Sequence, residues 1–65
     1  MQTSEQNDDR IIEQLRIISD TLADRALSAL KEAHAQGESK RPDRERTLTQ
    51  ARRAIEKAIN LLGRE

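Results

Sequence analysis

Two stretches with apolar residues at helical spacing, separated by one break between Gly37 and Pro42, most strongly constrain how this chain can fold. In the first stretch Ile11, Leu15 and Leu22 fall on one side of a helix, because successive residues turn by about 100°. The alternation typical of a strand is absent from the sequence. The pattern therefore predicts an all-α protein, an antiparallel two-helix hairpin.

The chain divides into a polar N-terminal segment and the hairpin. Residues 1–10 carry no apolar period, so we expect either a disordered tail or a solvated first turn. Residues 11–65 carry the hairpin, with helix 1 over about 5–36, a turn over 37–41 and helix 2 over about 42–63. A connection this short makes the two helices antiparallel neighbours.

Glycine, proline and acidic residues mark the helix ends. Gly37 is predicted to follow helix 1 at the C′ position with positive φ, and Gly63 to end helix 2 in the same way. Pro42 suits the first position of helix 2, where its missing N–H is not needed. Asp43 and Glu45 then lie in the first turn, where the helix dipole favours acids.

The apolar residues predict a seam along each helix and more apolar surface than one hairpin covers. The arc on helix 1 is about 140° wide, whereas contact with one helix covers a narrow stripe. We therefore expect two hairpins to dimerise into an antiparallel four-helix bundle. The residues expected to form the dimer and core seam are Ile12, Leu15, Leu22, Ala26, Ala29, Leu48, Ala51, Ile55, Ala58 and Leu62. The small residues Ser19 and Ala33 are expected on the same seam of helix 1, where a buried serine is tolerable.

The small size of the chain also favours self-association. A fold of 65 residues has a marginal core, and such folds usually add disulfides, a metal or a partner chain. There is no cysteine and only one histidine, which excludes disulfides and a His-rich metal site. A partner chain is the remaining means of stabilisation, and a homodimer is the simplest one.

The sequence contains no group of residues that suits catalysis. His34 lies near the end of helix 1 without a nucleophile beside it, and it is expected to be a solvated side chain favoured by the helix dipole. Glu13, Asp20 and Asp24 lie on the outer face rather than on the seam, and no Glu-x-x-His motif occurs. We expect no enzymatic activity, no catalytic residue, no cofactor and no metal site.

Charge is distributed unevenly along the chain. Residues 1–36 hold four Lys or Arg and seven Asp or Glu, whereas residues 37–65 hold eight and five. The hairpin would then have a basic tip and an acidic opposite end. A solvated surface with ion pairs explains this pattern, and so does a patch that binds nucleic acid or an acidic protein. The basic patch would consist of Lys40, Arg41, Arg44, Arg46, Arg52 and Arg53.

These observations lead to two hypotheses of function. The first is a small non-enzymatic protein-interaction or regulatory module that acts as a homodimer and can bind a protein partner. The alternative is a nucleic-acid-binding regulator that uses the basic tip; the absence of aromatic residues removes base stacking from that hypothesis. No apolar run is long enough for a signal peptide or a membrane span, so we expect no membrane partner and a cytoplasmic location.

Overall fold

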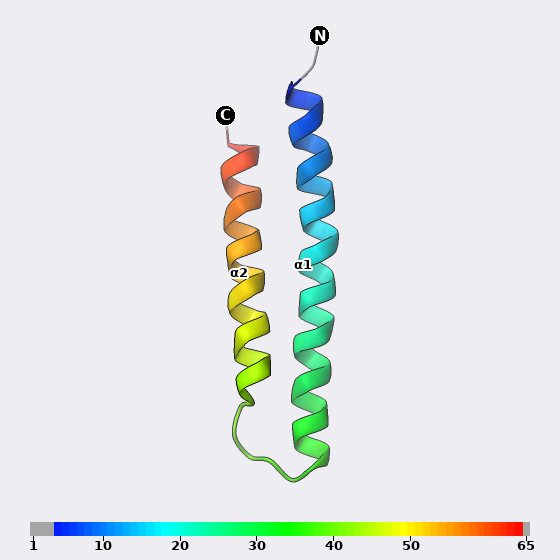
Figure 1. Ribbon diagram of the computed structural model, residues 1–65, viewed down its shortest axis with the longest axis vertical. Helices are drawn as coiled ribbons and strands as arrows, with labels where there is room; N and C mark the ends of the chain where they lie inside the picture. Colours follow the sequence, from blue (N-terminus) through cyan, green and yellow to red (C-terminus); the bar gives the residue numbers. More distant parts are fainter. Residues whose placement is uncertain (1–3, 65) are drawn as a thin grey trace.

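Two long helices lie side by side and run in opposite directions (Figure 1). The structure is a computed structural model that describes the backbone of residues 4–64 and the side chains of residues 8–64. Helix α1 comprises Ser4–Ala35 and helix α2 comprises Asp43–Gly63. The predicted all-α hairpin is confirmed. Of the polar segment predicted at 1–10, residues 1–3 lie outside the described residues, and residues 4–10 belong to α1.

Gly37 ends α1 through a Schellman motif. Its φ is +85°, as the sequence predicts, and this conformation strains any residue with a Cβ. The amide of Glu38 donates to the carbonyl of Ala33 over 2.9 Å, and the amide of Gly37 donates to the carbonyl of His34 over 3.0 Å. These are the two bonds of the motif, so the carbonyls of Ala33 and His34 are satisfied and the chain reverses.

The start of α2 differs from the prediction by one residue. Pro42 precedes the helix as its N-cap, with an extended ψ of 149°, whereas the first helical position had been expected for it. Its carbonyl accepts the first hydrogen bond of the helix, from the amide of Arg46 over 3.2 Å. The N-cap suits proline because the residue there is half outside the helix, and the ring already fixes a compatible φ of −69°.

The end of α2 also corrects a prediction. Gly63 is the last helical residue and does not take the positive φ that was expected of a C′ glycine. Arg64 continues in an extended conformation, with φ of −81° and ψ of 137°. Because the chain does not fold back here as it does after α1, no left-handed residue is required.

The interior of the hairpin is a single line of small residues on α1. Ser19, Ala26 and Ala33 are buried, with 7 to 8% of their surface exposed. They recur every seven residues, two turns of helix, and so lie on one line facing α2. The molecule is a rod, with a radius of gyration of 15.5 Å, where a compact domain of this length would have about 11 Å. One hairpin therefore has almost no core.

Candidate interaction surface

The structure places every residue of the predicted seam between or beside the two helices. Ser19, Ala26 and Ala33 are buried, and the other nine residues are half-buried. Half-burial means that the opposite helix covers only part of each side chain, so the helix–helix contact alone does not bury them. These nine residues are Ile12, Leu15, Leu22, Ala29, Leu48, Ala51, Ile55, Ala58 and Leu62.

Two of the most buried positions are small residues that the sequence predicts on the seam of helix 1. Ser19 and Ala33 are as buried as Ala26, although one is polar and both are small. Side-chain size and hydropathy give little indication of this burial, whereas the helical spacing of the two residues indicates it. Small side chains at these positions let the backbone of α2 approach closely.

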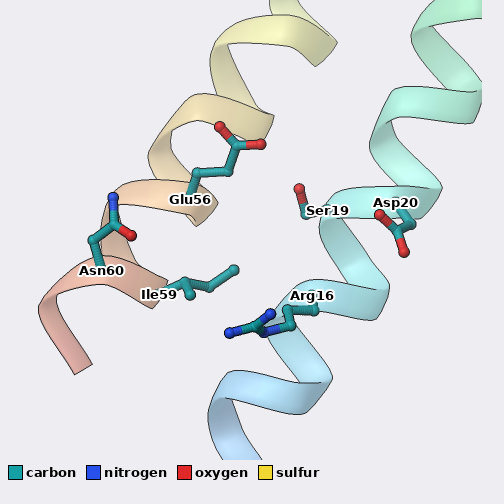
Figure 2. Close-up of a pocket in the computed structure, with 6 residues that line it drawn as sticks. All are labelled: Arg16, Ser19, Asp20, Glu56, Ile59 and Asn60. Atoms are coloured by element: carbon teal, nitrogen blue, oxygen red, sulfur yellow. The ribbon is translucent and has the colours of Figure 1, made fainter. Parts of the chain in front are cut away.

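One side of the hairpin carries a polar depression, which we call the notch. It has a volume of about 420 Å³ and is lined by residues of both helices. In Figure 2 the side chains of Arg16 and Ile59 extend toward each other across the space between the helices. Ligand pockets in proteins are mostly apolar and enclosed, so this polar surface depression does not fit a small-molecule site. Its lining residues are Arg16, Ser19, Asp20, Glu56, Ile59 and Asn60.

The opposite side of the hairpin is apolar, and helix geometry shows which residues share it. Ala29 and Arg44 together line a shallow depression near the tip, so they lie on the same side of the hairpin. Eighteen residues make five whole turns of an α-helix. Ile11 precedes Ala29 by eighteen residues and Leu62 follows Arg44 by eighteen. Ile11 and Leu62 therefore lie on this same side.

The apolar side extends over most of the length of the paired helices. Ile18 lies within about 20° of Ile11 on α1, and Ala51 lies within about 20° of Leu62 on α2. Ile11, Ile18 and the neighbouring Leu61 keep 42%, 45% and 52% of their surface exposed. We call this surface the apolar face, and its residues are Ile11, Ile18, Leu22 and Ala29 of α1 and Ala51, Ala54, Ala58, Leu61 and Leu62 of α2.

The other two exposed large apolar residues do not belong to the apolar face. Ile17, which is 58% exposed, lies about 180° around α1 from the line of Ser19 and Ala26 and so points away from α2. Leu27, which is 51% exposed, lies on the notch side, about 20° from the line of Arg16. Isolated apolar residues of this kind are normal on protein surfaces.

The structure does not bring the six bases of the predicted patch together. Arg44 lines the depression on the apolar side of the tip, whereas Arg46 lines a different one on the outer surface of α2. Arg53 follows Arg46 by seven residues and shares that outer surface. Lys40 and Arg41 belong to the connection between the helices, and half-buried Arg52 lies farther from the tip, near the middle of α2. The bases surround α2 instead of forming one surface.

Half of these bases also form ion pairs within α2 and its N-terminal approach. Arg41 donates to Glu45, Arg46 donates to Asp43 over 2.9 Å, and Arg52 donates to Glu56 over 3.0 Å. Each pair joins residues three or four apart on an exposed surface, where an ion pair contributes less than about 1 kcal/mol. The pairs do, however, reduce the positive potential of the tip.

Glu45 is the described acid whose titration is most clearly altered by its surroundings. The hydrogen bond from Arg41 holds the pKa of Glu45 below its ordinary value, and desolvation opposes this effect in part. The Thr49 hydroxyl also donates to Glu45, over 2.9 Å, and lowers the pKa further. Glu45 thus links the connection to the first two turns of α2.

Two other kinds of site receive no support from the described part of the chain. The described side chains, those of residues 8–64, include no group of three or more His, Cys, Asp or Glu close enough together to hold a metal ion. Neither described helix combines the length and apolar character that crossing a membrane requires.

No protein family, curated protein or solved structure matches this chain. The burial and the surface of the hairpin are therefore the basis for inferring its function.

Proposed function

We propose that this protein is a non-enzymatic interaction or regulatory module whose functional unit is a homodimer. Two hairpins pack through their apolar faces and form an antiparallel four-helix bundle. The outward surfaces of that bundle, which carry the notch and most of the charged side chains, then remain accessible to a protein partner.

The burial of the hairpin carries this proposal. Among the described residues, those that are buried are a serine and two alanines, and no large apolar side chain is fully covered. Complete burial of one Leu or Ile stabilises a fold by roughly 1.5–3 kcal/mol, and most of this gain is missing from a single hairpin. A second apolar face supplies the missing burial without any change to the helices.

The exposed area is large enough for such an interface. The chain exposes 5311 Å², whereas compact monomers of 7.4 kDa expose about 4200 Å². Each partner in a standard protein–protein interface covers about 800 Å². The excess of about 1100 Å² therefore suffices for one interface of ordinary size.

Two adjacent isoleucines provide the matched test. Ile18 lies on the apolar face and Ile17 on the outer surface, and both are exposed in the hairpin. Ile18→Glu should weaken dimerisation at least about 100-fold, because it buries unpaired carboxylates in the interface. Ile17→Glu should leave the dimer intact. Sedimentation equilibrium measures the mass, and circular dichroism should show that helicity falls together with the mass. Equal behaviour of the two variants would contradict the proposal.

The alternative function, nucleic-acid binding by the basic tip, makes a different prediction. Binding that comes from phosphate contacts weakens steeply with salt, with a log–log slope of about −0.9 for each duplex phosphate neutralised. Lys40 and Arg44 would carry much of it, since several neighbouring arginines pair with acids of α2. Tight binding in a mobility-shift titration that Lys40→Gln with Arg44→Gln abolishes would favour the alternative.

A further inference from the structure

The apolar face is not the same at its two ends. We call the end where α1 begins and α2 ends the open end, and the end formed by residues 36–42 the tip (Figure 1). On the basis of the homodimer proposed above, we propose that the second copy docks with its tip at the opposite end, so that each tip lies beside the open end of its partner. The twofold axis then runs perpendicular to the helices.

Side-chain size changes along the apolar face. All its large residues lie in the open-end half, with Ala54 and Ala58 among them, whereas the tip half carries only Ala29 and Ala51. The large residues are Ile11, Ile18, Leu22, Leu61 and Leu62. With the tips at opposite ends, large side chains of one copy pack over alanines of the other, and the interface keeps an even thickness. With the tips together, large residues meet at one end and alanines at the other, which holds the tip ends apart and leaves cavities there.

Since the chain has no cysteine, single spin labels can measure the orientation directly. Ser39→Cys places a label in the exposed turn, and Arg53→Cys places a control label on the outer surface at the middle of α2. Ser39 lies fourteen residues from position 53, the middle of α2. At 1.5 Å per residue, tips at opposite ends separate the two Ser39 labels by about 40 Å along the helices. Tips at the same end would leave them within about 25 Å, since packed helices lie 8–10 Å apart.

Pulsed dipolar spectroscopy on the full chain has three distinct outcomes. A separation of about 40 Å or more for Ser39→Cys, with less than about 30 Å for Arg53→Cys, supports the proposed orientation. Short separations for both labels would overturn the orientation but leave the homodimer. The absence of dipolar coupling from both labels, with the mass of one chain, would overturn the proposed homodimer itself.

Discussion

Gly63 of α2 lies against Ile12 of α1: a Cβ placed on Gly63 would stand 3.9 Å from Ile12 Cδ1. This distance is ordinary van der Waals contact, so the position has room for a methyl group. Gly63 is helical, and a helical glycine lowers helix stability relative to alanine because it has more freedom in the unfolded chain. The contact therefore identifies a glycine that the fold does not need.

The two glycines should respond to alanine in opposite ways. Gly63→Ala should raise the free energy of unfolding by as much as about 1 kcal/mol, since it adds helix propensity and a contact with Ile12. Gly37→Ala should lower it by about 1–2 kcal/mol, because φ of +85° strains a residue with a Cβ even where space is open. Urea denaturation at one fixed protein concentration measures both, and changes of the same sign would contradict the assignment.

Substitutions of Ser19 test whether its position requires a small side chain. Ser19→Ala should leave the free energy of unfolding unchanged or raise it by about 0.5 kcal/mol, because alanine is the better helix former and has no hydroxyl to bury. Ser19→Leu should lower it by roughly 1–3 kcal/mol, because a larger side chain forces α2 away from α1. Thermal unfolding followed by circular dichroism distinguishes the two; a stabilising Leu would show that the close approach is not required.

Glu45 gives the hairpin a specific dependence on pH. Its folded-state pKa lies below the ordinary 4.5, so its contribution is complete at neutral pH and is lost as pH falls through the folded value. Glu45→Gln should therefore lower the melting temperature at pH 7, and the difference from the unaltered protein should shrink below about pH 4. Glu13→Gln, on the exposed outer face of α1, is the control and should show a smaller difference at pH 7. A difference for Glu45→Gln that is constant with pH would contradict the role of its charge.

Much of the hairpin follows from local rules that the sequence displays. Apolar residues at helical spacing predict the two helices, and a glycine flanked by polar residues predicts the left-handed conformation at Gly37. The exact positions of Pro42 and Gly63 did not follow, because cap positions one residue apart differ little in energy for these residues. The sequence predicts the end of a helix more exactly where the chain must reverse, as it does after α1.

The arrangement of the surface depends on which flank of each helix meets the other. The sequence places Ile11 and Ile18 on one flank of α1 and Leu61 off the seam of α2, but it does not show that these flanks face the same side. The depression that Ala29 and Arg44 both line shows that these two flanks lie on the same side of the hairpin. Likewise, the charge pattern predicts a basic tip, but the pairing of Arg41 with Glu45 and the spread of bases around α2 depend on side-chain positions.

One hairpin buries little apolar surface, and we propose that it obtains the missing burial from a second copy. The most direct test is the melting temperature of the full chain over a hundredfold range of protein concentration, with the mass measured by sedimentation equilibrium at both limits. A homodimer should give twice the mass of one chain at the upper limit and a melting temperature that rises with concentration. A fully helical protein with the mass of one chain and a melting temperature independent of concentration would contradict it.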